Sequence, residues 1–333
     1  MGMLIDGIWR HEIDRYMRDG AFEREASTLP DHAVCDIAAR LRDNTRLALI
    51  VSQSCPWSHR TTLVRALRGL HEVEVVVAGG PRVEGYAVRG FNETAPGDAP
   101  IRHVHQLYSA TDPAFTGRAT VPLLWDVQAR TILSNSSATI ARGLDRVGGD
   151  WRLAPDPMAS DIDALNAQIY EGLANAVYRA GFATEQDAHA KAVRDVFATL
   201  DWLETLLADR RCLFGHQITE ADLFLFATLI RFDSVYASLF RCTRRRLVDY
   251  PVLWAYARDV FAWPGIAGTF DFDANLRGYF QNDGDNNPHG IVPELPDLDW
   301  TKPHGRDPLG SLMVWQNGTL VSLEDVSCGD HAT

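Results

Sequence analysis

In Leu47-Ala-Leu-Ile-Val-Ser-Gln-Ser-Cys-Pro-Trp-Ser58, a run of five apolar residues leads through a polar turn to a cysteine and a proline. A continuous apolar run of this length is typical of a strand that is buried on both faces. Apolar residues then recur at helical spacing from Trp57 to Leu70, and the valine-rich segment Val73–Val77 follows. This order of strand, helix and strand predicts a βαβ unit, whose crossover should be right-handed.

A second pair of strands and a helix complete the predicted α/β domain. Val121-Pro-Leu-Leu-Trp125 and Thr131-Ile-Leu133 are short apolar runs that lie close enough for a hairpin. Ser134–Ser137 supply capping residues for a helix over 138–144. The preceding connection, 79–118, is rich in Gly, Pro, Asn and Asp, and long connections of this kind in compact domains usually serve a function.

The second half of the chain has helical periodicity. Apolar residues step by three or four from Ile162 to Val177 and from Val193 to Leu207, and Thr219-Glu-Ala-Asp222 has the form of a capping box. We therefore predict an α/β domain followed by an all-helical one. The expected limits are 1–43 for an N-terminal arm, 44–150 for the α/β domain, 158–300 for the helical domain and 301–333 for an irregular C-terminal tail.

Composition and charge exclude several classes of function. The 333 residues carry 32 basic and 44 acidic side chains, a formal net charge of −12, which argues against binding along nucleic-acid backbones. No apolar run approaches the roughly 18 residues of a membrane-spanning helix, and the N-terminus has no signal-peptide pattern. Five scattered cysteines do not form the disulfide framework of a secreted protein. We expect a cytoplasmic enzyme or binding protein.

Cys55 stands between the first strand and the first helix of the predicted βαβ unit. Unpaired N–H groups and the positive end of the helix dipole favour a thiolate at that position. Pro56 suits the first helical turn, and Ser58 stands where a second cysteine could have closed a disulfide. A second thiol from solution would therefore have to resolve any mixed disulfide on Cys55. The alternative is a buried, inert cysteine.

Two further features suggest a binding site for a small thiol peptide. Pro122 makes Val121-Pro122 a candidate cis bond, which would leave the backbone of Val121 free to pair with an extended peptide. Ser136 and Ser137, at the start of the next helix, can bind a carboxylate through N–H groups and hydroxyls. Plain helix capping explains these two serines equally well.

Longer motifs resemble one family. The chain is similar to the Xi class of glutathione transferases, the glutathionyl-hydroquinone reductases, from about residue 44 to 300. The matching segments include Ser54-Cys-Pro-Trp-Ser-His-Arg60, Thr116-Gly-Arg-Ala-Thr-Val-Pro-Leu-Leu-Trp-Asp126, Val177-Tyr-Arg-Ala-Gly-Phe-Ala183, Arg231-Phe-Asp-Ser-Val-Tyr236 and Asn287-Pro-His-Gly-Ile-Val-Pro293. The resemblance implies a thioredoxin-like domain, an all-α domain and a homodimer.

The resemblance also implies a reaction and its residues. A cysteine would remove glutathione from a glutathionyl-hydroquinone as a mixed disulfide, which a second glutathione would release, with no metal. Cys55 would be the nucleophile, with Tyr178 and Tyr279 over the aromatic substrate. The thiol-binding residues would be Trp57, Tyr86, Arg118, Val121, Pro122, Ser136 and Ser137.

Three departures from the family leave the co-substrate open. The family pattern is Glu-Ser where this chain has Ser136-Ser137, and Trp where Tyr86 follows Gly85. The segment around 79–100 is also shorter and matches the family poorly. A different thiol such as mycothiol, or a different acceptor, would explain these changes. The alternatives to reductive release are therefore a transferase or isomerase that uses a non-glutathione thiol, and a non-catalytic binding protein with this fold.

The remaining chemistry-bearing residues suggest no second site. His103 and His105 alternate as neighbours on a strand would, and the sequence offers them no third metal ligand at a suitable spacing. The basic cluster Arg241–Arg246 is interpreted as a solvated surface. Cys212 and Cys242 are predicted to be core residues, and Cys328 an exposed residue of the tail.

Overall fold

The computed structural model describes residues 2–11, 17–24, 26–43, 45–94 and 100–327, which divide between two compact units. The first unit comprises 1–17, 23–147 and 268–293, and the second comprises 18–22, 148–267 and 294–333. The sequence predicted one helical domain over 158–300, but 268–293 belongs to the first unit. Helical periodicity alone cannot show against which unit a helix packs.

A five-stranded mixed sheet forms the centre of the first unit, in the order β7-β6-β5-β8-β9. Its strands are β5 (Leu47–Val51), β6 (Glu74–Gly79), β7 (Ala87–Val88), β8 (Leu123–Asp126) and β9 (Thr131–Ser134). β5 is parallel to β6 and antiparallel to β8, and β8 pairs antiparallel with β9. The βαβ unit and the hairpin predicted from sequence are both confirmed, and β7 is an additional edge strand.

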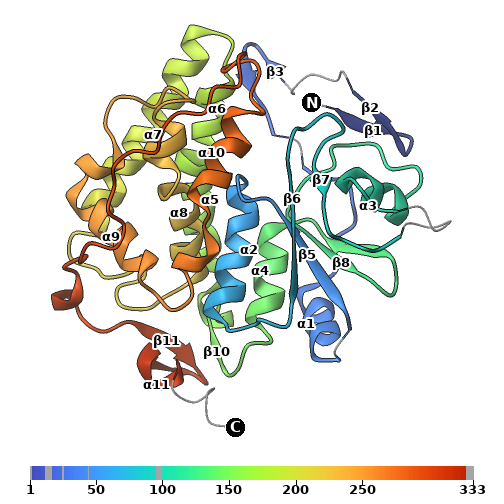
Figure 1. Ribbon diagram of the computed structural model, residues 1–333. Helices are drawn as coiled ribbons and strands as arrows, with labels where there is room; N and C mark the ends of the chain where they lie inside the picture. The colour runs from blue at the N-terminus through green and yellow to red at the C-terminus, as the bar shows by residue number, and fades with distance from the viewer. Residues whose placement is uncertain (1, 12–16, 25, 44, 95–99, 328–333) are drawn as a thin grey trace. The chain divides into compact units, whose positions relative to one another are not determined.

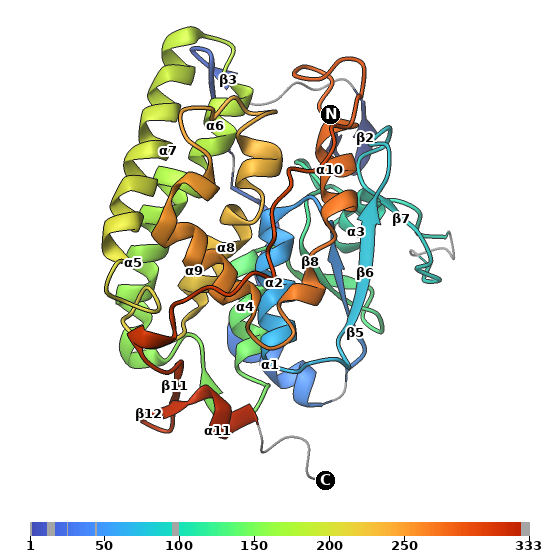
Figure 2. The same cartoon turned by 60° about the vertical axis from the view of Figure 1, so that its left-hand side comes forward.

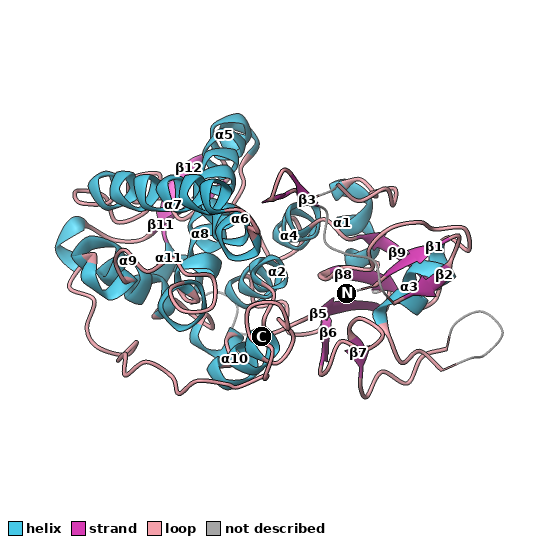
Figure 3. Ribbon diagram, turned by 90° about the horizontal axis from the view of Figure 1, so that it is seen from above, coloured by secondary structure: helices cyan, strands magenta, loops and turns pink. Residues whose placement is uncertain are grey.

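Helices cover both faces of this sheet (Figures 1 and 3). The helices of the first unit are α1 (Val34–Arg42), α2 (Pro56–Leu67), α3 (Val104–Thr111), α4 (Ser137–Asp145) and α10 (Phe272–Phe280). α2 and α4 pack together on one face, and α3 lies on the other. Leu107 and Tyr108 of α3 join Ile50 and Trp125 of the strands in the apolar core. The five buried residues of β5 are explained by this burial on two faces.

The first residues add short strands to the two units. β1 (Met3–Ile5) and β2 (Ile8–Arg10) form a hairpin, and Leu4 exchanges backbone hydrogen bonds with Gly117 at 2.9 and 3.0 Å. β3 (Met17–Arg18) and β4 (Ala21–Phe22) form another short pair. The sequence predicted an arm over 1–43, and the helix α1 within it is additional structure that the weak periodicity did not indicate.

The second unit is mainly helical. Its helices are α5 (Ala159–Ile169), α6 (Ala176–Phe182), α7 (Gln186–Leu206), α8 (Glu220–Leu229) and α9 (Pro251–Phe261), with π-helical turns over Tyr170–Ala174 and Phe232–Tyr236. α8 is buried on every side and begins with the predicted capping box of Thr219 and Asp222. Among the described residues, no helix has the length and apolar character needed to cross a membrane.

The C-terminal segment contains regular structure rather than the predicted irregular tail. β11 (Met313–Gln316) and β12 (Thr319–Ser322) form a hairpin at one end of the second unit (Figure 2), and α11 (Leu323–Ser327) follows. β11 also pairs with β10 (Trp151–Arg152) to give a three-stranded sheet. The pairing of β10 with β11 joins distant parts of the chain, so no local sequence pattern indicates it. The β11–β12 hairpin does have a local signal, because Asn317-Gly318 is the dipeptide preferred in two-residue hairpin turns and both residues have positive φ.

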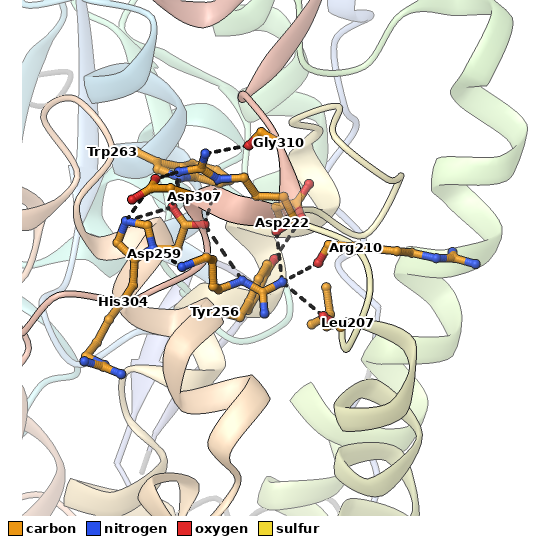
Figure 4. Close-up of polar contacts among 12 residues, drawn as sticks. Leu207, Arg210, Asp222, Tyr256, Asp259, Trp263, His304, Asp307 and Gly310 are labelled. Atoms are coloured by element: carbon orange, nitrogen blue, oxygen red, sulfur yellow. Dashed lines mark hydrogen bonds and ion pairs between the residues drawn. The ribbon is translucent and has the colours of Figure 1, made fainter.

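A buried polar network fastens this segment to the helices (Figure 4). Asp259 of α9 accepts two hydrogen bonds from Arg211, from Nε at 3.0 Å and Nη2 at 3.2 Å, and a third from Trp263 Nε1 at 3.2 Å. Arg211 also donates to the carbonyl of Gly310 at 2.7 Å and to Asp307 at 3.0 Å. The tail is therefore held by charge-assisted hydrogen bonds as well as by strand pairing.

Candidate active site

The predicted site residues lie together at one end of the strands of the central sheet. Because β5 and β9 both run antiparallel to β8, their carboxyl ends lie at the same edge, and α2 and α4 begin there. Cys55 is the N-cap residue of α2, and Ser136 is that of α4. Val121 and Pro122 enter β8 from this same edge. The topology thus places a cysteine, a free stretch of backbone and a helix N-terminus on one side of the sheet.

Cys55 is held at the beginning of α2 by its neighbours. Its side chain is mostly buried, with 9% exposed, and Sγ accepts a hydrogen bond from the N–H of Ser58 at 3.4 Å. On its other side Sγ lies 3.4 Å from the carbonyl oxygen of Val121, to which the thiol can donate. An N–H donor and the helix N-terminus both stabilise negative charge on sulfur. This geometry suits a sulfur that reacts as a thiolate.

The peptide bond between Val121 and Pro122 is cis, as the sequence suggested. Both residues precede β8, which begins at Leu123. The carbonyl of Val121 faces Cys55, so the backbone at this point and the reactive sulfur are immediate neighbours. An extended peptide that paired with Val121 would therefore carry its own sulfur close to Cys55.

Ser136 and Ser137 lie where the sequence placed them, at the start of α4. The hydroxyl of Ser136 accepts a hydrogen bond from the N–H of Thr139 at 3.2 Å, so this serine acts as a helix cap. Thr139 in turn donates from its hydroxyl to Asp31 at 2.7 Å. The same hydroxyl lies 3.0 Å from Ser136 Oγ, so Thr139 connects a carboxylate of the N-terminal arm to the cap of α4. No sequence pattern indicated Asp31, because it lies more than 100 positions before Ser136 along the chain.

Arg82 is a second residue that the sequence did not single out. It follows β6 at the active edge, and its guanidinium donates to Ser54 Oγ at 3.2 Å, one residue before Cys55. The same guanidinium lies 4.3 Å from the centre of the Tyr86 ring, a cation–π contact. Asn282 accepts the backbone N–H of Arg82 at 2.9 Å. Arg82 thus brings a positive charge to the loop that carries the cysteine.

Tyr108 of α3 forms hydrogen bonds with two segments of the site, the one before the cis bond and the one before α4. Its buried hydroxyl donates to the carbonyl of Thr120 at 3.0 Å and accepts from Asn135 Nδ2 at 2.9 Å. Thr120 precedes the cis bond, and Asn135 precedes the cap of α4. Burial raises the pKa of this phenol, which stays protonated and able to donate. Tyr108 is therefore a positioning residue for both halves of the thiol site.

The other predicted residues divide between the units. Trp57 is half-buried in α2, with the guanidinium of Arg60 4.5 Å from its ring centre. Arg118 is half-buried beside the backbone that pairs with β1, and Tyr279 is buried in α10. These residues share the first unit with Cys55. Tyr178 belongs to α6 in the second unit, where it packs among Phe182, Tyr236 and Phe240.

Gly278 shows how closely α10 approaches the cysteine loop. A methyl group there would lie 2.6 Å from Ser54 Cβ and 2.8 Å from its Oγ. Gly→Ala inside a helix ordinarily stabilises by about 1 kcal/mol. We expect Gly278→Ala to lower the unfolding temperature instead, because this contact forces Ser54 and the neighbouring Cys55 to shift. The matched change Gly284→Ala meets nothing within 4 Å and should have no such effect in thermal unfolding. Equal melting of both variants would contradict the expectation.

The remaining described cysteines differ from Cys55 in burial. Cys212 and Cys242 are fully buried in the second unit, as predicted, and Cys35 is exposed, whereas Cys328 lies outside the described residues. Burial raises the pKa of Cys242 to about 12 and that of Cys212 well above its ordinary range.

Native alkylation should separate these cysteines. Because only the thiolate reacts, we expect iodoacetamide at pH 8 to modify Cys35 and Cys55 and to leave Cys212 and Cys242 unmodified. Peptide mass spectrometry measures this, and the guanidinium-unfolded protein, in which both buried thiols should react, is the control. Modification of Cys212 in the native protein would contradict the expectation.

His103 and His105 differ from the sequence-based expectation. They lie at the start of α3 and not on a strand, since His103 is the N-cap residue. Glu84, from the segment before β7, supplies a third potential ligand, with Oε2 3.6 Å from His103 Nδ1 and from His105 Nε2. Sequence spacing could not reveal this neighbour because it comes from another segment of the chain.

The fold and the site define a class: a thioredoxin-like unit with a single cysteine at the start of a helix, joined in one chain to a helical unit. Known proteins have the same organisation. Residues 54–147 match the family model for the glutathione S-transferase N-terminal domain, and residues 186–259 match the C-terminal domain model. Glutathionyl-hydroquinone reductase YqjG from Escherichia coli (strain K12) is 40% identical over 326 residues, which cover 92% of this chain and 99% of the relative.

Other relatives agree. Glutathionyl-hydroquinone reductase PcpF from Sphingobium chlorophenolicum is 38% identical, with 89% of this chain and 96% of the relative covered. The solved Xi Class GST from Natrialba magadii has a TM-score of 0.82 at 38% identity, with 92% and 98% covered. The glutathione-bound structure of YqjG has a TM-score of 0.76 at 38% identity, with 91% and 99% covered. This chain therefore belongs to the glutathione S-transferase family, and within it to the Xi class.

Proposed function

We propose that this enzyme removes glutathione from glutathionyl-hydroquinones, the reaction after which its relatives are named. The observation that carries the proposal is the environment of Cys55, which has an N–H donor, a helix N-terminus and the backbone carbonyl of Val121 beside it, with Ser58 in place of a resolving cysteine. A sulfur placed in this way can form a disulfide with a bound thiol, and a second thiol from solution must break it.

The proposed reaction has two steps. The Cys55 thiolate attacks the glutathione sulfur of the aryl thioether, so a sulfur–sulfur bond forms and the carbon–sulfur bond breaks. The electron pair of that bond stays with the aromatic carbon, which takes up a proton and becomes the free hydroquinone. A second glutathione thiolate then attacks the mixed disulfide, which releases oxidised glutathione and regenerates Cys55. In sum, one aryl thioether and one glutathione give one hydroquinone and one glutathione disulfide.

The surrounding residues have distinct proposed roles. Val121 would pair with the backbone of glutathione, and the N-terminus of α4 with Ser137 would bind a carboxylate. Trp57, Tyr86, Arg118, Pro122 and Ser136 would complete the thiol site. The phenols of Tyr178 and Tyr279 would donate hydrogen bonds to the quinol oxygens.

Product analysis tests this function. The purified protein, incubated with a glutathionyl-hydroquinone and glutathione, should release hydroquinone and glutathione disulfide in equal amounts, measured by liquid chromatography with mass spectrometry. When the second glutathione is omitted, the protein should gain the mass of one glutathionyl group on Cys55. Formation of a new thioether from a quinone and glutathione, without disulfide, would instead favour the alternative of a conjugating transferase. No turnover and no adduct would favour a binding protein.

The identity of the thiol depends on Asp31. We propose that this carboxylate, connected to Ser136 through Thr139, replaces the family's glutamate as partner for the ammonium group of glutathione, so that glutathione rather than mycothiol is the co-substrate. We expect Asp31→Asn, placed in a Cys55→Ser background, to weaken glutathione binding about fivefold, as is typical of an exposed charge pair worth about 1 kcal/mol.

Isothermal titration measures this change, and the matched control is Asp36→Asn, which alters an exposed carboxylate of α1. Ser136→Glu in the same background should strengthen binding if the site still lacks negative charge. Unchanged affinity in the Asp31 variant, together with tight binding of a thiol that has no γ-glutamyl ammonium, would overturn the assignment of glutathione. We further propose a cytoplasmic homodimer, which sedimentation and fractionation would test.

A further inference from the structure

A cluster of three ligand-type side chains in the first unit has no role in the proposed reaction. One nitrogen or oxygen atom from each of Glu84, His103 and His105 lies within 4.8 Å of the others. In the part of the chain that the structure describes, no other three histidine, cysteine or acidic side chains meet in this way. Two imidazoles and one carboxylate are a donor set that suits divalent transition-metal ions.

The backbone around the cluster is fixed by hydrogen bonds. Val104 donates its N–H to the carbonyl of Tyr86 at 2.9 Å, and Val88 donates to Arg102 at 2.7 Å. The side-chain oxygen of Gln106 accepts the N–H groups of Arg102 and His103 at 2.7 and 2.9 Å. These contacts hold the segment that carries Glu84 against the start of α3, so the three side chains converge from two fixed pieces of chain.

The distances fit a shared ion better than direct hydrogen bonds. Glu84 Oε2 lies 3.6 Å from both His103 Nδ1 and His105 Nε2, which is too long for a hydrogen bond. Ligands about 2.1 Å from a tetrahedral zinc ion are separated by about 3.4 Å. His105 Nε2 is buried and has no hydrogen-bond partner among the described residues. An unpaired buried nitrogen is costly, and a bound metal ion would satisfy it.

Ring contacts also hold the two imidazoles in place. Trp9 stacks on His105 with ring centres 4.8 Å apart, and the His103 and His105 rings lie nearly parallel at 5.5 Å. The side chain of His105 is only 13% exposed, and its ring contacts those of both Trp9 and His103, so packing fixes its orientation.

We propose that Glu84, His103 and His105 bind one divalent transition-metal ion, zinc in the first instance, with water completing the coordination. The site would fasten the segment that carries Tyr86 to the start of α3, with Trp9 of the N-terminal hairpin packed against it. The proposal does not depend on the assigned reaction, because none of the three residues takes part in it.

Zinc titration of the metal-free, untagged full-length chain tests the site. Accessible thiols are first blocked with iodoacetamide so that cysteines do not bind the metal. Isothermal titration with zinc chloride should show one ion per chain, and a cobalt(II) titration should give the visible absorption of a low-symmetry site. Glu84→Gln and His103→Asn should each weaken zinc binding by at least about tenfold, since even changes outside the ligand shell cost that much.

The control is His71→Gln, which alters an exposed histidine distant in sequence from the cluster and should bind zinc as the unmodified chain does. Glu84 and His103 are both partly exposed, so their variants should retain the fold, and far-UV circular dichroism checks this. Absence of stoichiometric zinc binding would overturn the proposal. So would zinc binding that Glu84→Gln and His103→Asn leave unchanged.

Discussion

Replacing Cys55 by serine is expected to lower kcat/KM for release of glutathione from a glutathionyl-hydroquinone by at least about 10³-fold, as losses of a catalytic nucleophile commonly do. The Cys55 sulfur accepts the N–H of Ser58 and faces the carbonyl of Val121, so serine fits the same space. A serine hydroxyl, however, is a poor nucleophile toward sulfur and cannot form the disulfide that glutathione resolves. Steady-state assays with product quantification measure the effect.

The matched control is Cys35→Ser, which changes the exposed cysteine of α1 and should retain the activity of the unmodified enzyme. Cys55→Ser should also still bind glutathione, since the backbone of Val121 and the start of α4 are untouched. Retention of activity within tenfold by Cys55→Ser would contradict the role of Cys55 as nucleophile, because glutathione from solution would then have to attack the substrate sulfur directly. Reductive release would in that case proceed without a mixed disulfide on the enzyme.

The parts of the fold that could be predicted from the sequence are those with local signals. The five apolar residues from Leu47 to Val51 indicated a central strand, and the capping residues at Thr219 indicated the start of α8. In both cases the residues that carry the signal lie within one element. The pairing of β11 with β10 joins residues more than 150 positions apart, and no property of either short strand specifies its partner. The same holds for α10, whose placement beside Ser54 depends on Gly278.

The residues of the candidate site also fall into those with a local sequence signal and those without one. Cys55, Val121 and Ser136 could be predicted because each lies at the end of a strand or helix that the sequence indicates. Arg82 and Asp31 come from irregular segments and reach the site only through side-chain contacts with Ser54 and Thr139. Such contacts are properties of the folded chain. The sequence could have suggested Arg82 only through the predicted parallel pairing of the two strands, because residues that follow β6 then lie at the same end of the sheet as residues that follow β5.

The second large effect concerns stability. We expect Asp259→Asn to lower the free energy of unfolding of the second unit by about 3–5 kcal/mol, the usual cost of removing one partner from a buried ion pair. The Asp259 side chain is only 2% exposed, and it accepts both Nε and Nη2 of Arg211. Arg306 Nε also lies 3.9 Å from Asp259 Oδ2. Asparagine keeps the shape but removes the buried charge that, together with the exposed Asp307, offsets two largely buried guanidinium groups.

Urea unfolding followed by tryptophan fluorescence measures this loss, and Asp273→Asn is the matched control. Asp273 pairs with Arg277 at 2.7 Å, but both side chains are more than half exposed, so solvent replaces the lost contact and the unfolding midpoint should not move.

The double variant Asp259→Asn/Arg211→Gln separates two causes of the lost stability. If the damage comes from uncompensated buried charge, removing Arg211 as well should restore part of the stability. If it comes only from the lost hydrogen bonds of Asp259 with Arg211 and Trp263, the double variant should be less stable than either single one. Equal unfolding midpoints of Asp259→Asn and Asp273→Asn would show that the network in Figure 4 does not hold the tail to α9.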